Sequence, residues 1–133
     1  MTPETIKRNV QFVARQLGFD DCRISAAQRA PHADNYLNWV EQGHAGDMGW
    51  LEQNVERRCD PREILPGCRS VISLALNYLP AKDHPDSGYR IARYSWNDDY
   101  HDLIEEKLKD LNLALEDMGG QQRYYVDTGP ILE

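Results

Sequence analysis

The feature that most constrains the fold is the apolar segment over residues 70–78, which reads Ser-Val-Ile-Ser-Leu-Ala-Leu-Asn-Tyr. Its length and its β-branched residues predict a strand rather than a helix. Its nearly continuous apolar character is typical of a strand that is buried on both faces. Such a strand needs other elements packed on either side of it, so the segment predicts a layered fold.

Helices are predicted near both ends of the chain. Thr2 is a suitable cap, Pro3 suits the first helical position, and apolar residues then recur at helical spacing up to Gly18. The longest helix is expected over residues 98–118, where two acidic residues at its start suit the helix dipole. Gly119 follows it as a helix terminator.

The other expected elements complete an alternation of helices and strands. In chain order they are a strand over 21–26, a helix over 32–42, a glycine-rich turn and short helix over 43–51, a polar loop over 57–62, a turn over 64–67, an exposed loop over 80–88, a short strand or extended segment over 89–94, and a final strand over 122–126. This order predicts an α/β or α+β architecture, a layered sheet with flanking helices. The length of 133 residues suits a single domain over 1–133.

Composition excludes several classes of function. The chain has 15 Lys and Arg against 22 Asp and Glu, a net charge of −7, which argues against unaided binding to phosphate backbones. It has no run of about 18 apolar residues and no apolar segment behind a basic start, so we expect a cytoplasmic protein without a membrane span. Cys22, Cys59 and Cys68 lack the spacing of a zinc or iron–sulfur site, and we expect small buried or half-buried thiols.

Two stretches are dense in groups that do chemistry. Residues 90–101 gather arginines, aromatic residues, acids and a histidine at the start of the predicted long helix, where side chains face a cleft or an anion. The alternative is an aromatic anchor for that helix with capping acids. In residues 124–133, Asp127 follows a predicted strand, a common place for an acid–base group. The alternative is an Asp that accepts hydrogen bonds from the turn after it.

Six motifs in register make the chain resemble a known family, epoxyqueuosine reductase. They are Gly46-x-Met48, Arg58-x-Asp60-Pro61, Leu65-Pro66-Gly67-Cys68-Arg69-Ser70-Val71-Ile72, Ala92-Arg93-Tyr94-Ser95, Asp99-Tyr100-His101 and Val126-Asp127-Thr128-Gly129-Pro130-Ile131-Leu132-Glu133. The resemblance covers essentially the whole chain and corresponds to the N-terminal, cobalamin-associated domain of the family.

The resemblance implies a reductase that uses cobalamin and iron–sulfur clusters. The family reduces epoxyqueuosine to queuosine in the anticodon loop of tRNA, and electrons pass through two [4Fe–4S] clusters to cobalt. By its place in the motif, Asp127 is the expected proton donor and lies at the cofactor. Arg58 and Ala92 match cofactor-binding positions, and Tyr94 and residues 99–101 (Asp-Tyr-His) match a possible cleft; no metal ligand is expected in this chain.

The resemblance also implies that this chain is a fragment. The family continues into a ferredoxin-like region with eight cluster-binding cysteines, which is absent from these 133 residues. We therefore expect the isolated chain to lack reductase activity and to require a cluster-bearing domain or partner. Two alternatives stay open: a non-catalytic module that binds a corrinoid or docks to a partner, and a fragment without independent function.

Overall fold

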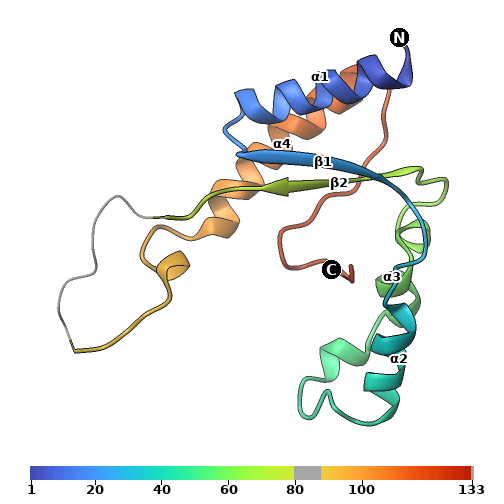
Figure 1. Ribbon diagram of the computed structural model, residues 1–133, viewed down its shortest axis with the longest axis vertical. Helices are drawn as coiled ribbons and strands as arrows, with labels where there is room; N and C mark the ends of the chain where they lie inside the picture. Colours follow the sequence, from blue (N-terminus) through green and yellow to red (C-terminus); the bar gives the residue numbers. More distant parts are fainter. Residues whose placement is uncertain (80–87, 133) are drawn as a thin grey trace. The chain divides into compact units, whose positions relative to one another are not determined.

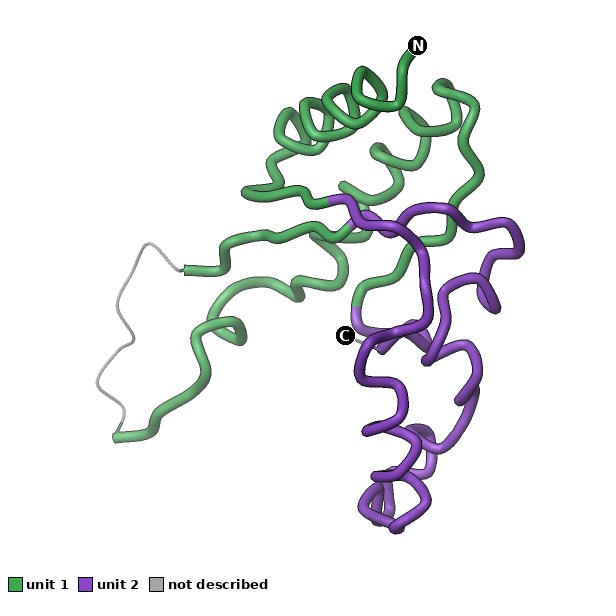
Figure 2. The backbone as a smooth tube through the Cα atoms, turned by 45° about the vertical axis from the view of Figure 1, so that its right-hand side comes forward, with its two compact units in different colours: residues 1–23, 73–126 green, residues 24–72, 127–133 purple. Residues whose placement is uncertain are grey.

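The computed structural model describes residues 1–79 and 88–132 (Figure 1). The chain divides into two compact units (Figure 2). Unit 1 consists of residues 1–23 and 73–126, and unit 2 consists of residues 24–72 and 127–133. The loop predicted over residues 80–88 lies outside the described residues, apart from Gly88.

Of the two long helices of unit 1, α1 begins where the sequence predicts it, and α4 begins at Tyr100 rather than at residue 98. Helix α1 spans Pro3–Gln16, and the Thr2 hydroxyl accepts the backbone N–H of Thr5 at its start. Helix α4 spans Tyr100–Asp117, and the Asp99 carboxylate accepts a backbone N–H of its first turn. These caps satisfy helix N–H groups that have no partner within the helix.

The core of unit 1 lies where α1 and α4 run side by side (Figure 1). Its buried helical residues are Val10, Ala14, Leu108 and Leu111. The Nζ of Lys107 on α4 donates to the Leu17 carbonyl at 2.7 Å, next to the end of α1. This bond places a cation at the C-terminal end of α1, where the helix dipole favours positive charge.

The described residues contain one pair of antiparallel strands. Strand β1 spans Asp21–Ala26 and strand β2 spans Ser70–Ala75, and they lie side by side in Figure 1. The start of β1 pairs with the end of β2, because the hydrogen bonds that flank the pair run from the Asp20 N–H to the Ala75 carbonyl and from the Ala27 N–H to the Arg69 carbonyl.

Two strand predictions are wrong in detail. Strand β2 ends at Ala75 rather than at residue 78, and its residues are half-buried or exposed instead of being buried on both faces. Among the described residues the sheet has two strands, and an antiparallel pair can leave one face in solvent. The strand predicted over residues 122–126 is absent from the described chain, where that segment forms no ladder with β1 or β2.

Unit 2 is built from short helices. They are α2 (Ala33–Glu41), η1 (Gly49–Glu52), α3 (Val55–Cys59) and η2 (Pro61–Glu63). The polar loop predicted over residues 57–62 is wrong, because α3 and η2 occupy it. Asn54 is the N-cap residue of α3; its φ of 54° lies in the left-handed region, and its carbonyl accepts the Arg58 N–H. Asp60 then caps η2 with Pro61 at its first position.

The fold is therefore a mixture of helices with a small two-stranded sheet. The three cysteines all fall in the described ranges and are free thiols, with Cys22 and Cys59 buried and Cys68 half-buried, as the sequence predicted. Burial raises the pKa of the Cys22 thiol. No helix in residues 1–79 and 88–132 is long and apolar enough to cross a membrane.

Candidate functional site

Arg58 on α3 is held by two main-chain carbonyls of unit 2. Its Nε donates to the Gln53 carbonyl and its Nη2 donates to the Trp50 carbonyl, both at 3.1 Å. The side chain therefore fastens the turn η1, which precedes α3. A guanidinium has five N–H donors, so these two bonds leave capacity to bind a phosphate or an amide oxygen.

The rest of the Arg58-x-Asp60-Pro61 motif stabilises the turn after α3. The Asp60 carboxylate accepts the backbone N–H of Arg62 at 2.9 Å and pairs with its guanidinium, whose Nη2 lies 2.6 Å from Oδ2. These hydrogen bonds, the side-chain bond first, lower the pKa of Asp60 from 3.8 to about 2. Asp60 thus has a structural role in this turn, and its carboxylate remains ionised at neutral pH.

Asp127, the predicted proton donor, has an unusual backbone. Its φ is +57°, in the left-handed region that few residues other than glycine adopt, and its side chain is exposed. The segment that follows is fastened to α3, because the Leu132 N–H donates to the Arg58 carbonyl at 3.1 Å. Arg58 and Asp127 both belong to unit 2, and the chain that follows Asp127 is bonded to the backbone of Arg58.

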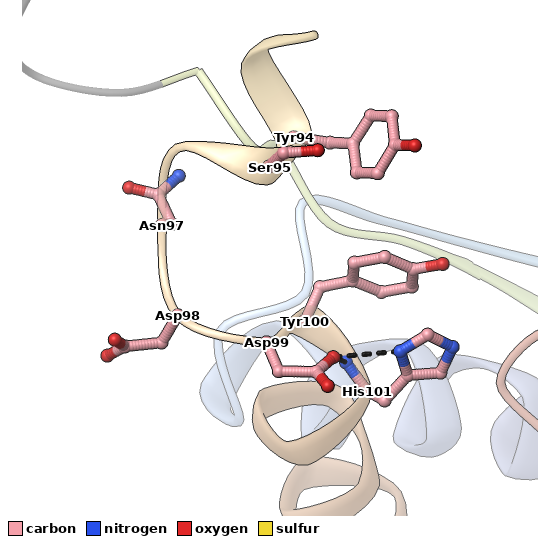
Figure 3. A pocket seen from close by; sticks show the side chains of 7 residues that line it. All are labelled: Tyr94, Ser95, Asn97, Asp98, Asp99, Tyr100 and His101. Atoms are coloured by element: carbon pink, nitrogen blue, oxygen red, sulfur yellow. Dashed lines mark hydrogen bonds and ion pairs between the residues drawn. The ribbon is translucent and has the colours of Figure 1, made fainter. Parts of the chain in front are cut away.

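In unit 1, Asp99 and His101 form a pair at the start of α4. Asp99 Oδ1 accepts the His101 backbone N–H at 2.9 Å and lies 2.8 Å from the ring nitrogen Nδ1 (Figure 3). These two bonds, the backbone bond first, lower the pKa of Asp99. The Asp99 carboxylate thus caps the helix, which confirms the predicted capping acid. It also orients the His101 imidazole, which lies beside a hollow.

That hollow has a volume of about 390 Å³ and is lined by residues 94–101 except Trp96. The Tyr94 ring lies edge-on to the Tyr100 ring at 6.0 Å, and the Tyr100 ring stacks on His101 at 4.2 Å. In Figure 3 both tyrosine rings extend to one side of the loop, whereas the Asp98 carboxylate points to the other. The wall therefore combines aromatic faces with carboxylate and imidazole groups.

The structure brings together four residues of the expected cleft, namely Tyr94 and residues 99–101. Ala92 lies just before them, exposed, at the start of the single turn η3 (Arg93–Ser95). Ser95, which ends a quoted motif, and Asn97 also line the hollow, although neither was expected in the cleft; their position within the dense stretch 90–101 was the available signal. Tyr94 also meets Tyr78 edge-on at 6.4 Å, so the aromatic anchor is present as well.

The predicted site residues fall into both units. Unit 2 contains Arg58 and Asp127, and unit 1 contains Ala92, Tyr94 and residues 99–101. No group of three or more His, Cys, Asp or Glu side chains in the described part of the chain is arranged to hold a metal ion. The described residues thus offer hydrogen-bond donors, an acid and aromatic surface, but no ligand set for a cluster.

Comparison with known proteins places this geometry in context. The family described as "Epoxyqueuosine reductase QueG, DUF1730" matches residues 58–128. An epoxyqueuosine reductase from Cyclobacterium marinum is 35% identical over 97% of this chain and 44% of its own length. The chain therefore spans less than half of that relative.

Solved structures give the same result. A crystal structure of epoxyqueuosine reductase with an epoxyqueuosine-modified tRNA-Tyr stem loop has a TM-score of 0.80 and 26% identity, covering 96% of this chain and 36% of that one. An epoxyqueuosine reductase from Bacillus subtilis has a TM-score of 0.69 and 28% identity, covering 86% of this chain and 32% of that one. The latter structure has its catalytic aspartate loop swung out of the active site.

Proposed function

Because this chain belongs to the epoxyqueuosine reductase family, we propose that it is part of an enzyme that reduces epoxyqueuosine to queuosine in tRNA. The observation that carries the proposal is the family match over residues 58–128, which contains Arg58, Ala92, the hollow and Asp127. A relative solved with a modified tRNA stem loop supports the anticodon loop as the substrate. The free thiols suit the reducing cytoplasm.

The chemistry of epoxide reduction determines which groups the protein must supply. Reduction of the epoxide consumes two electrons and two protons, breaks both carbon–oxygen bonds, forms a carbon–carbon double bond and releases the oxygen as water. The opening of the ring leaves negative charge on that oxygen, so an acid placed beside it lowers the barrier. The protein must therefore supply a proton at one atom and hold the nucleotide at the electron donor.

The residues present fit cobalamin, the cofactor that the family implies. Arg58 has N–H donors beyond those used for Trp50 and Gln53, and these suit the amide and phosphate oxygens of the cofactor. Ala92 is exposed with an extended backbone, at φ −58° and ψ 136°, so its small side chain allows a flat ring close to the main chain. Cobalamin, when bound, supplies the low-potential electrons for the reduction.

The residues present do not fit iron–sulfur clusters. A cluster needs four thiolates, and Cys22, Cys59 and Cys68 are three thiols, two of them buried. Within the ranges 1–79 and 88–132 no metal-binding group occurs. The clusters would then belong to a further domain or to a partner. We likewise propose that β1 and β2 belong to a larger layered sheet in the N-terminal domain of the complete enzyme.

Asp127 is our candidate for the proton donor. It follows Val126 in the motif of the family, and its side chain is exposed. A left-handed φ turns the side chain away from the direction of the preceding extended backbone, which suits a group that must reach a substrate. The swung-out catalytic aspartate loop of the Bacillus subtilis relative is consistent with an acid carried on such a segment.

The test is Asp127→Asn in the complete enzyme. Asparagine tolerates a left-handed φ as well as aspartate does, so the fold is kept while the acid is removed. We expect cobalamin binding, followed by its visible spectrum, to be unchanged. Turnover of epoxyqueuosine in tRNA should fall by about 100-fold or more, the range of a lost general acid.

Two outcomes are decisive. Turnover that survives in Asp127→Asn removes Asp127 from the chemistry. A cobalamin spectrum without any shift on mixing with the complete protein contradicts the proposed function itself. The isolated 133-residue chain, assayed with and without a cluster-bearing partner, separates an incomplete enzyme from a module that only binds a corrinoid.

A further inference from the structure

We propose that residues 89–96, here called the arginine–aromatic segment, contact unpaired nucleotides of the RNA loop that flank the modified base. The inference rests on the proposed function, because it names the part of this chain that meets the RNA substrate. The segment leads along the gold trace of Figure 1 into the turn η3 and towards α4. It lies entirely within unit 1.

The segment exposes side chains that proteins usually cover. Tyr89 is 79% exposed, Ile91 is 53% exposed and Tyr94 is 50% exposed. Arg90 and Arg93 are exposed between them. Alternating arginines and aromatic rings suit single-stranded RNA, because the rings stack on unpaired bases and the guanidinium groups pair with phosphates.

The local charge has the opposite sign to that of the whole chain. Residues 88–97 contain two arginines and no acid, in a protein whose net charge is −7. The acids that follow are Asp98 and Asp99, and the Asp99 carboxylate already binds the backbone N–H and the ring of His101. The net charge of −7 disfavours broad binding to phosphates, so a contact with RNA calls for a local cationic segment such as this one.

Internal contacts hold the segment in one shape. The Trp96 ring N–H donates to the Ile91 carbonyl at 2.9 Å, and the Ser95 N–H donates to the Ala92 carbonyl at 3.0 Å. The Arg93 guanidinium carbon lies 5.9 Å from the centre of the Trp96 ring, within reach of a cation–π contact. Trp96 thus fastens the turn, while the rings of Tyr89 and Tyr94 remain exposed. A preformed surface binds RNA with less loss of conformational freedom.

The position of the segment agrees with the chemistry. Reduction requires the modified nucleotide to reach the cofactor, and Ala92 is our candidate for a residue that faces the cofactor. The hollow begins at Tyr94, within the segment. Nucleotides on either side of the reacting one must then pass close to the neighbours of Ala92. Arginine and tyrosine also occur in protein interfaces, and the test separates that possibility.

The experiment measures binding of an unmodified tRNA anticodon stem-loop RNA to the full protein by fluorescence anisotropy. We expect Tyr89→Ala to weaken binding by about 5- to 100-fold, the range for loss of one base–aromatic stack. Arg90→Ala should weaken binding and reduce the slope of log K against log salt by about 0.7, the value for one phosphate on a single strand.

Matched controls lie on α1. Phe12→Ala removes another exposed ring (63% exposed), and Arg8→Ala removes another exposed arginine, which lies 3.5 Å from Glu4. Both should leave RNA affinity within about twofold of the parent protein. Far-ultraviolet circular dichroism and urea unfolding should be the same for all four variants, since all four side chains are at the surface.

Equal RNA affinity in the segment variants and the α1 variants overturns the inference, as does an absence of RNA binding by the parent protein. Variants that change sedimentation but not RNA affinity overturn it as well, in favour of a protein interface. The proposed function is tested separately. If the folded variants still reduce epoxyqueuosine, the proposed function stands whatever their RNA affinity. A protein that binds RNA through this segment but does not bind cobalamin contradicts the proposed function.

Discussion

Arg58→Ala separates a structural role of this arginine from its proposed role in cofactor binding. The substitution removes two hydrogen bonds, each 3.1 Å long, from the guanidinium to the Trp50 and Gln53 carbonyls. A hydrogen bond of this kind contributes about 0.5–1.5 kcal/mol net. We therefore expect the free energy of unfolding to fall by about 1–3 kcal/mol, a measurable part of the ~5–15 kcal/mol of a typical domain.

Urea unfolding followed by circular dichroism measures the stability term, and a cobalamin titration measures the binding term. Arg57→Ala is the matched control, since Arg57 is the exposed neighbour on the same helix and its loss should cost less than about 0.5 kcal/mol. Arg58→Lys keeps the charge but loses the planar fork, so it should recover little of either term. If Arg57→Ala and Arg58→Ala have the same free energy of unfolding, Arg58 does not stabilise η1. If a folded Arg58→Ala variant binds cobalamin as tightly as the parent protein, Arg58 has no role in cofactor binding.

Two further predictions concern the scaffold. Leu111→Ala should lower the free energy of unfolding by about 2–5 kcal/mol, because Leu111 is only 3% exposed on α4, a helix that packs against α1. Leu113→Ala on the same helix, where the side chain is 59% exposed, should change it by less than about 0.5 kcal/mol. Equal urea midpoints for the two variants would contradict the packing described for α4. The Asp60–Arg62 pair should make the free energy of unfolding depend on pH, because the pKa of Asp60 is lowered to about 2 in the folded state. The stabilisation from this ion pair is present in full above about pH 4 and is lost as the pH falls towards 2. The stability difference between the parent and Asp60→Asn, measured by urea unfolding from pH 6 downwards, should shrink over that range, and a difference that does not depend on pH counts against the ion pair.

The sequence predicted α1, β1 and α4 because the residues of each element contain the signals that define it. Thr2 and Pro3 mark the start of α1, and Asp99 marks the start of α4, with hydrogen bonds that the structure contains. The error at residues 122–126 has a different origin, since a strand exists only when a neighbour pairs with its backbone. Hydrophobic pattern alone does not reveal that neighbour. The same reason explains why β2 is half-exposed despite its apolar sequence.

Sequence motifs nominate the residues of the candidate site but do not predict the contacts that these residues make. Motif spacing identified Arg58, but only the structure shows that its guanidinium fastens η1 through Trp50 and Gln53. Helix α3 was missed because five residues are too few for an apolar period to appear, and the left-handed Asn54 that precedes it has no strong sequence signal. Contacts between residues distant in the sequence, such as Leu132 to Arg58, depend on the folded chain.

At Asp127 the backbone and the proposed proton donation would select the same kind of residue. Its φ of +57° favours Gly, Asn and Asp, so a structural argument alone would accept any of the three at this position. Proton donation accepts only the carboxylic acid. Asp127→Ala should therefore cost about 1 kcal/mol of stability that Asp127→Asn does not, while both remove turnover. Urea unfolding and the reductase assay, applied to the two variants together, distinguish the requirements. If Asp127→Asn were destabilised as much as Asp127→Ala, the carboxylate itself would be holding the turn, which is the structural alternative for this residue.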